Sequence, residues 1–129
     1  MSGVLVDSDV IIEVLRQRNP EILRRWVELV DSPEALICSP VSVAEVFHGM
    51  RDRERDAIET VFSAMICLPV EQDIGWRAAD YLRLFQRSHV IELGDALIAA
   101  TASRHDLALW TLNRKHFPMK DVRFYVGPH

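Results

Sequence analysis

The stretch Val4-Leu5-Val6-Asp7-Ser8-Asp9 constrains the fold of this chain more than any other part of its sequence. Three apolar residues run directly into two acids, and apolar residues at helical spacing follow from Val10 to Leu15. This pattern predicts a buried parallel strand over residues 4–6 that leads into a helix. Because ligands of open parallel sheets bind at the carboxyl ends of the strands, Asp7 is expected to face an active site.

Strand and helix patterns alternate along the rest of the chain. Further strands are predicted over residues 35–39, 66–70, 107–111 and 122–126, and Pro69 indicates that the strand over 66–70 lies at an edge. Helices are predicted between them, one with Asn19 as its N-cap and Pro20 in its first position, and one capped by Asp73. The segment 96–102 is almost wholly apolar, which predicts a buried helix. The alternation indicates a single α/β domain with a mostly parallel sheet flanked by helices.

The helix predicted after Asp73 mixes aromatic side chains with arginines. Such a mixture can bind nucleic acid. At helical spacing, however, it more often places the apolar side chains in the core and the arginines in solvent. We therefore expect a core-facing set on this helix, consisting of Trp76, Ala79, Tyr81, Leu82 and Phe85.

The composition argues against a membrane protein and against indiscriminate binding of polyanions. No apolar run approaches the roughly 18 residues that a membrane span needs. The N-terminus lacks the basic and apolar regions of a signal peptide, so we expect a cytoplasmic protein. A formal net charge of −4 disfavours general attraction to nucleic acid. Since 13 of the 15 basic residues are arginine, which grips phosphate bidentately, a local arginine-lined groove is compatible with this charge.

Four polar residues occupy strand-end or helix-start positions, which a parallel sheet gathers at one edge: Asp7, Glu45, Asp95 and Asn113. Clustered carboxylates raise each other's pKa, so such a cluster usually implies a cation. Oxygen ligands without cysteine or a pair of histidines suit a hard ion such as Mg²⁺ or Mn²⁺. The reaction that best matches this ion is in-line displacement at phosphorus, in which the metal activates water and neutralises the developing charge.

Some of these acids also have a purely structural interpretation. Asp9 is expected to cap the first helix or to support the site from outside, rather than to bind the metal directly. Asp95 could likewise only cap the helix that it opens. Glu45 is harder to explain structurally, because its neighbours in sequence are apolar and an unpaired acid buried among them would be costly.

Four segments, at residues 4–11 (VLVDSDVI), 42–49 (SVAEVFHG), 94–102 (GDALIAATA) and 111–118 (TLNRKHFP), carry these residues. In this order and spacing the chain resembles PIN-domain ribonucleases, in particular the VapC-type toxins of bacterial toxin–antitoxin pairs. The third segment is the most specific, and the resemblance covers nearly the whole chain. It implies a five-stranded parallel sheet flanked by helices, with Asp7, Glu45 and Asp95 as an acidic Mg²⁺ site.

The resemblance also implies a reaction and partners. Metal-activated water would attack an RNA phosphodiester and leave 5′-phosphate and 3′-hydroxyl ends. Thr111 would hydrogen-bond a site carboxylate, and Arg114 and Lys115 would contact RNA phosphates. Asn113 stands where many relatives carry Asp, and a neutral amide is a weaker ligand, which disfavours a tightly bound second metal. Such toxins usually form homodimers and are silenced by a small VapB-like antitoxin whose C-terminal segment covers the site.

Two other classes share part of this pattern. The start of haloacid dehalogenase-type phosphatases also has two acids after a strand; there Asp7 would be the phosphoryl-accepting nucleophile and Asp9 the acid–base. That chemistry needs a lysine ahead of a late acidic motif, whereas Lys115 and Lys120 both follow Asp95. A non-enzymatic receiver-type signalling domain suits the length of 129 residues. It would require an Asp at the end of a middle strand and a Lys on a late strand, which this chain does not offer convincingly.

Overall fold

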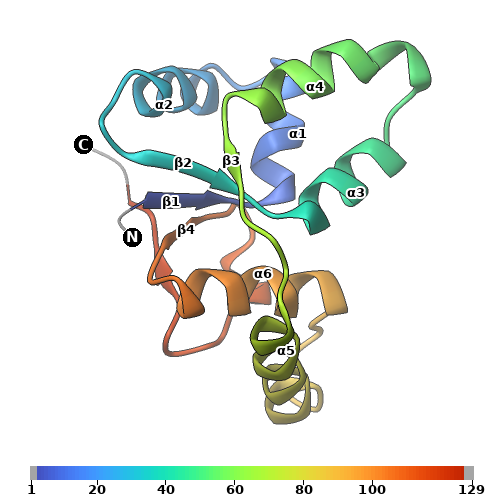
Figure 1. The fold of residues 1–129 in the computed structure, drawn as a ribbon, viewed down its shortest axis with the longest axis vertical. Helices are drawn as coiled ribbons and strands as arrows, with labels where there is room; N and C mark the ends of the chain where they lie inside the picture. The colour runs from blue at the N-terminus through green and yellow to red at the C-terminus, as the bar shows by residue number, and fades with distance from the viewer. Residues whose placement is uncertain (1–2, 127–129) are drawn as a thin grey trace.

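A five-stranded sheet forms the centre of the fold, in a computed structural model that describes residues 3–126 (Figure 1). The strand order is β3-β2-β1-β4-β5, and every neighbouring pair is parallel. The strands are β1 (Gly3–Val6), β2 (Ala35–Cys38), β3 (Ile66–Cys67), β4 (Ala108–Trp110) and β5 (Arg123–Phe124). The predicted α/β fold with a five-stranded parallel sheet is therefore confirmed.

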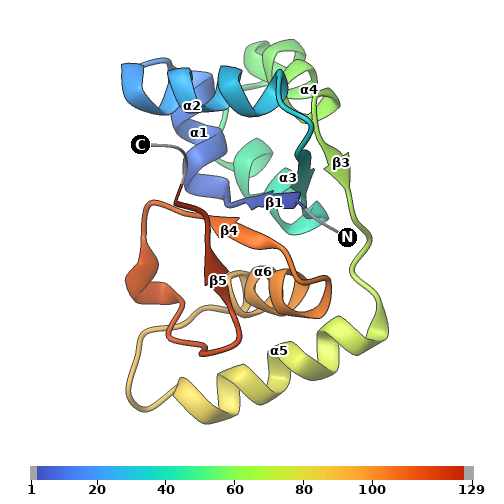
Figure 2. The same ribbon diagram turned by 90° about the vertical axis from the view of Figure 1, so that its left-hand side faces the viewer.

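In the part of the chain that the structure describes, six α-helices cover the sheet, and Figure 2 shows α1 and α2 on the opposite side from α5 and α6. They are α1 (Ser8–Arg16), α2 (Pro20–Val30), α3 (Pro40–His48), α4 (Arg55–Ser63), α5 (Gln72–Phe85) and α6 (Leu93–Arg104). Two short 3₁₀ turns, η1 (Asp52–Glu54) and η2 (Arg114–His116), lie before α4 and after β4. Within residues 3–126, none of the helices has the length and apolar character needed to cross a membrane.

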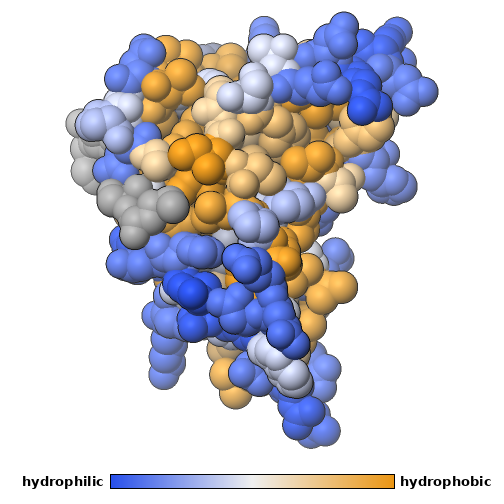
Figure 3. Space-filling model, viewed as in Figure 1, coloured by the Kyte–Doolittle hydropathy of each residue, from blue (hydrophilic) through white to orange (hydrophobic). Residues whose placement is uncertain are grey.

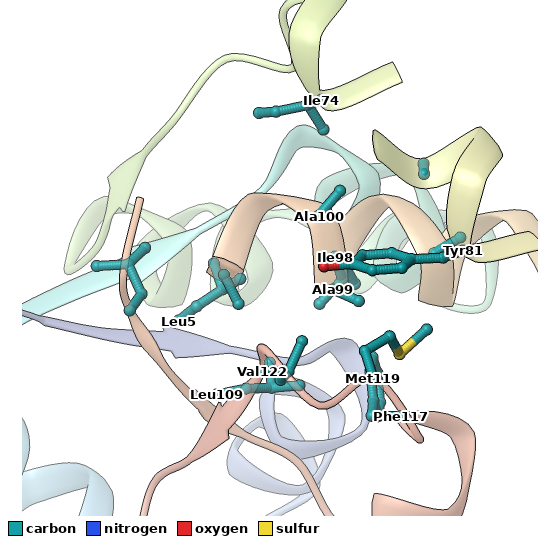
Figure 4. Packing of buried hydrophobic residues seen from close by; sticks show 14 of the residues in the cluster. Leu5, Ile74, Tyr81, Ile98, Ala99, Ala100, Leu109, Phe117, Met119 and Val122 are labelled. Atoms are coloured by element: carbon teal, nitrogen blue, oxygen red, sulfur yellow. The ribbon is translucent and has the colours of Figure 1, made fainter. Parts of the chain in front are cut away.

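The sheet separates two apolar cores, because successive side chains of a strand point to opposite faces. Along β1, Val4 and Val6 pack in the core that includes α1 and α2, whereas Leu5 packs in the core beneath α5 and α6. Figure 4 shows Ala99 and Ala100 of α6 in this second core, between the sheet and α5. These small side chains let α6 lie close to the sheet, and α6 carries one of the candidate acids at its start.

Two local predictions are confirmed. Asn19 caps α2 with its side chain, and Pro20 occupies the first helical position. The strand that contains Ile66 lies at the edge of the sheet, as Pro69 predicted, although β3 is only two residues long. A proline cannot donate to a sheet hydrogen bond, so β3 ends before Pro69.

Two expectations about α5 are wrong. Its N-cap is Glu71, and Asp73 lies inside the first turn. Trp76 and Ala79, which were expected in the core, are exposed, and 70% of the surface of Trp76 is accessible. The buried side of α5 passes through Ile74, Ala78 and Tyr81, with Leu82 and Phe85 packed against the same core, so the other three members of the predicted set are confirmed.

Candidate active site

The strand order places a switch point between β1 and β4. From the central strand β1, the chain first builds β2 and β3 on one side and later β4 and β5 on the other. Ligand crevices of parallel sheets form at such points, outside the carboxyl ends of the strands. Val6 pairs with Trp110, so Asp7 and Thr111, which follow them, lie side by side.

Asp7 is buried in this crevice, with 7% of its surface exposed. Its Oδ1 accepts a hydrogen bond from the NH of Ser8 (2.8 Å), which makes Asp7 the N-cap of α1. Its Oδ2 accepts from the hydroxyl of Thr111 (2.8 Å), the kind of contact that the sequence predicted for Thr111. Burial, reinforced by the charge of Asp9, raises the pKa of Asp7 to about 7. An adjacent cation would favour the ionised form of this carboxyl group at neutral pH.

Asp9 does not cap α1, since Asp7 occupies the N-cap position, so the capping alternative that was expected for Asp9 is wrong. Its Oδ2 accepts from the NH of Leu112 (3.1 Å) and lies 3.4 Å from the Thr111 hydroxyl. Its Oδ1 is buried and has no hydrogen-bond partner in the part of the chain that the structure describes. Burial raises the pKa of Asp9, and the charge of Asp95 contributes to the rise.

Glu45 lies in the second half of α3 and is exposed, contrary to the expectation that it is buried among apolar neighbours. The buried residues of α3 are Ser42 and Val46, which lie four apart, so Glu45 falls outside the buried face. Its carboxylate nevertheless has a defined position, because the hydroxyl of Ser8 donates to its Oε1 (2.7 Å).

Asp95 is the third residue of α6 and contributes to the cap of that helix. Its Oδ2 accepts from the NH of Glu92 (3.3 Å), the N-cap residue, so the carboxylate belongs to the cap of the helix. The same oxygen lies 3.4 Å from Nδ1 of His116, across the crevice. Burial raises the pKa of Asp95, and its charge also raises the pKa of Asp7, so the two carboxylates share one electrostatic environment.

The loop after β4 carries the remaining predicted residues. The NH of Asn113 donates to the Thr111 hydroxyl (3.1 Å), and its side-chain amide lies 3.1 Å from Nε2 of His116. The guanidinium of Arg114 lies over the ring of Phe124, 4.9 Å from the ring centroid. Lys115 is exposed on the same 3₁₀ turn, η2. All three residues follow Thr111 in the segment that leaves the end of β4.

The sequence did not predict three further polar residues of the crevice. Ser8 contacts Glu45, and its hydroxyl also lies 2.8 Å from that of Ser42, which is fully buried. His116 lies between Asp95 and Asn113. The available signals were weak: Ser42 precedes Glu45 by one helical turn, and His116 follows Asn113 at the spacing of a 3₁₀ turn.

The chemistry of this donor set fits a hard divalent cation. Among residues 3–126, no three His, Cys, Asp or Glu side chains already enclose a position for a metal ion. The available donors are nevertheless mainly carboxylate oxygens, which Mg²⁺ and Mn²⁺ prefer. Asp9 Oδ1 is buried without a partner, and burial raises the pKa of Asp7, Asp9 and Asp95 alike. A bound cation would offset the cost of ionising these groups.

Comparison with known proteins gives consistent results. The family model of the PIN domain matches residues 4–124. Ribonuclease VapC10 of Mycobacterium tuberculosis is 44% identical over 117 residues, which cover 90% of this chain and 86% of that protein. The structure of VapBC2 from Rickettsia felis bound to a DNA fragment from its promoter has a TM-score of 0.81 at 16% identity, covering 97% of this chain and 98% of that one. A toxin–antitoxin complex from Klebsiella pneumoniae has a TM-score of 0.74 at 23% identity, covering 93% and 95% of the two chains.

Proposed function

The chain belongs to the PIN domain family, and we propose that it is a Mg²⁺-dependent endoribonuclease of the VapC toxin type. The relative that is 44% identical carries the name Ribonuclease VapC10. The observation that most directly supports this function lies at the end of β1. There Asp7, Asp9 and Asp95 interact electrostatically, and Glu45 contacts the residue that follows Asp7.

Asp7, Glu45 and Asp95 would hold Mg²⁺, or Mn²⁺ in its place, with Asn113 as a neutral oxygen donor beside them. When bound, the ion lowers the pKa of water and neutralises the charge that develops on the phosphodiester. Thr111 orients Asp7 through a 2.8 Å hydrogen bond. The expected products carry 5′-phosphate and 3′-hydroxyl ends.

Arg114 and Lys115 are the proposed contacts to RNA phosphates. Both lie on η2, directly after Asn113, and both are exposed. The guanidinium of Arg114 stacks on Phe124, which limits its conformational freedom before RNA arrives. We propose that this activity takes place in the cytoplasm.

Cleavage of total RNA in Mg²⁺, with and without EDTA, tests the proposed activity. Asp7→Asn and Asp95→Asn should each reduce the cleavage rate at least about 100-fold, since each removes a proposed metal ligand. Asp73→Asn is a matched control, because Asp73 also lies in the first turn of a helix but pairs with Arg104 away from the crevice. Wild-type rates in Asp7→Asn or Asp95→Asn would exclude the proposed site.

The proposed regulatory partner is a VapB-like antitoxin. An apolar groove of about 450 Å³ lies between α3 and α4, next to the helix that carries Glu45. Figure 3 shows hydrophobic surface on this face of the molecule. The groove can receive the apolar side of a peptide segment that then continues toward the acids; its lining residues are Val43, Ala44, Phe47, His48, Arg55, Ile58, Glu59 and Phe62. A gene for a small protein next to that of the chain, and co-purification of the two products, would support this partner.

We also propose that the protein forms a homodimer. Trp76, Leu84 and Leu93 are each more than 60% exposed, which is unusual for large apolar side chains. Sedimentation equilibrium of the purified chain measures the assembly state directly. A monomer at micromolar concentration would contradict this part of the proposal.

A further inference from the structure

The carboxylate of Glu45 lies between the first turns of two helices, α1 and α6, that pack on opposite faces of the sheet. On one side, its Oε1 accepts from the hydroxyl of Ser8 in α1 (2.7 Å). On the other side, its Oε2 lies against the backbone of Gly94 in α6, where a Cβ would come within 2.8 Å of it. Ser8 follows Asp7, and Gly94 precedes Asp95. The two contacts therefore hold Glu45 between the neighbours of the other two proposed metal ligands.

The space that Gly94 leaves open is specific to Glu45. All three of the nearest atoms to a Cβ at this position belong to the Glu45 carboxyl group, at 2.8, 3.4 and 3.6 Å. Gly94 lies in an α-helix, where alanine is more favourable than glycine. Helix stability therefore does not explain a glycine here, whereas the approach of Glu45 does.

Ser8 provides the hydrogen bond that attracts the Glu45 carboxylate, whereas Gly94 provides the space for it. Its side chain is buried, and its hydroxyl lies 2.8 Å from that of Ser42, one helical turn before Glu45. The α3 helix thus meets the start of α1 through Ser42 and Glu45 together. Without these contacts an exposed glutamate would occupy many rotamers, and ordering it would cost entropy when the metal binds.

We propose that Ser8 and Gly94 are positioning residues that hold the Glu45 carboxylate between Asp7 and Asp95, and thereby set the affinity of the site for its divalent cation. The inference rests on the proposed function, because it takes Glu45 as a metal ligand. It goes beyond the proposed function by assigning a role to the absence of a side chain at Gly94.

Gly94→Ala is the main test, with Mn²⁺ as the probe and its dissociation constant measured by titration calorimetry. The added methyl group displaces the end of a flexible, exposed side chain, so the protein should fold with an unchanged or higher melting temperature. Its affinity for Mn²⁺ should fall about 10- to 100-fold, as for other losses of groups that orient metal ligands. Gly75→Ala in α5 is the matched control, because a Cβ there would meet no atom within 4 Å beyond its own stretch of helix, and its affinity should equal that of the wild type.

Ser8→Ala and Ser8→Thr provide a second, independent pair. Alanine removes the hydroxyl and should weaken Mn²⁺ binding, whereas threonine keeps it and should retain tighter binding than alanine. The circular dichroism spectrum and melting temperature of each variant show whether it is folded. If Gly94→Ala does not fold, Ser8→Ala still tests the inference.

A double-mutant cycle with Glu45→Asp tests whether Gly94 acts through Glu45. The shorter acid does not reach the added methyl group, so Gly94→Ala should change Mn²⁺ affinity by less than about 3-fold in the Glu45→Asp background. Equal Mn²⁺ affinity in wild type, Gly94→Ala and Ser8→Ala would overturn the inference and leave the proposed function intact. Absence of Mn²⁺ binding by the wild type would overturn the proposed function and the inference with it.

Discussion

Asp7 and Asp9 interact with the same side chain although they have different roles. The Thr111 hydroxyl lies 2.8 Å from an oxygen of Asp7 and 3.4 Å from one of Asp9. Asp7 uses its other oxygen to cap α1, whereas the other oxygen of Asp9 is buried without a partner. Thr111 therefore contacts two carboxylates at once. The repulsion between their negative charges must be offset by a cation or by a proton.

The comparison of Asp9→Asn with Asp95→Asn separates a nuclease from a phosphatase. In a PIN-type nuclease, Asp95→Asn should reduce RNA cleavage at least about 100-fold, while Asp9→Asn should stay within about 10-fold of wild type. The rates are measured on a labelled RNA oligonucleotide and on p-nitrophenyl phosphate. Phosphatase activity that is lost in Asp9→Asn and kept in Asp95→Asn would instead support the dehalogenase-type mechanism.

The raised pKa of Asp7 makes the metal-free protein less stable at high pH. The carboxyl group titrates near 3.8 when unfolded and near 7 when folded, so the folded state binds the proton more tightly. The stability from protonated Asp7 is complete below about pH 4 and is lost as the pH rises through about 7. Asp7→Asn cannot ionise, so in EDTA it should exceed the wild type in stability by about 2–4 kcal/mol at pH 8 and match it at pH 4.

Urea denaturation in EDTA between pH 4 and pH 8 measures this difference. Asp73→Asn is the control of opposite sign, because its hydrogen bond with Arg104 lowers the pKa of Asp73. That variant should be less stable than wild type at neutral pH, and the difference should disappear as the pH falls through the lowered pKa. A difference between Asp7→Asn and wild type that does not vary with pH would contradict the proposed titration.

At the scale of single elements, the capping signal predicted the start of α2 correctly, but Asp9 and Asp73, which were expected to cap helices, do not. Asn19 and Pro20 begin α2 as predicted, because the capping contact lies within three residues. The face of α5 was predicted only in part, since Tyr81, Leu82 and Phe85 pack in the core whereas Trp76 and Ala79 are exposed. Its spacing is compatible with more than one helical face, and only the packing of α5 on α6 and the sheet selects one of them.

The cap of α2 should contribute measurably to stability without affecting the site. Asn19 Oδ1 accepts from the NH groups of Glu21 (3.0 Å) and Ile22 (3.3 Å). Asn19→Ala leaves these donors without the cap and should lower the free energy of unfolding by about 1 kcal/mol. Asn19→Asp keeps an acceptor and should remain near wild type in thermal denaturation. RNA cleavage should be unchanged in both variants, and a loss of activity would show that α2 is coupled to the crevice.

At the scale of the whole molecule, the proposed active site draws on residues from both sides of the sheet, and the sheet separates two apolar cores. Asp7 and Asp95 come from elements that pack in different cores, α1 on one side of the sheet and α6 on the other. Because the sheet is continuous between them, the positions of the two acids depend on the packing of both cores. Loss of packing in either core should therefore affect metal binding as well as stability.

The groove between α3 and α4 should separate inhibition from catalysis. Val43 lines the groove and is 40% exposed, so Val43→Glu places a charge where the antitoxin segment is proposed to pack. Antitoxin binding, measured by surface plasmon resonance, should weaken at least about 10-fold, while RNA cleavage by the free protein continues. Val27→Glu on α2 is the control, because Val27 is 55% exposed but lies outside the groove. Equal antitoxin affinity in both variants would place the partner elsewhere.

Several features of this protein follow from the sequence by itself. The strand at residues 4–6, the acid at its end, the edge position marked by Pro69 and the α/β class were all predicted correctly. Each of these depends on local periodicity or on the covalent geometry of one residue, which the sequence displays directly. The PIN-type motifs likewise lie in short contiguous segments.

Only the tertiary structure decided how the polar residues of the crevice contact one another. The hydrogen bond between Thr111 and Asp7 joins residues 104 positions apart, and that between Ser8 and Glu45 joins residues 37 positions apart. The cap formed by Asp7, the unpartnered oxygen of Asp9 and the exposure of Glu45 all depend on how helices pack on the sheet. The physical reason is that hydrogen bonding and desolvation act through space, at distances that sequence separation does not encode.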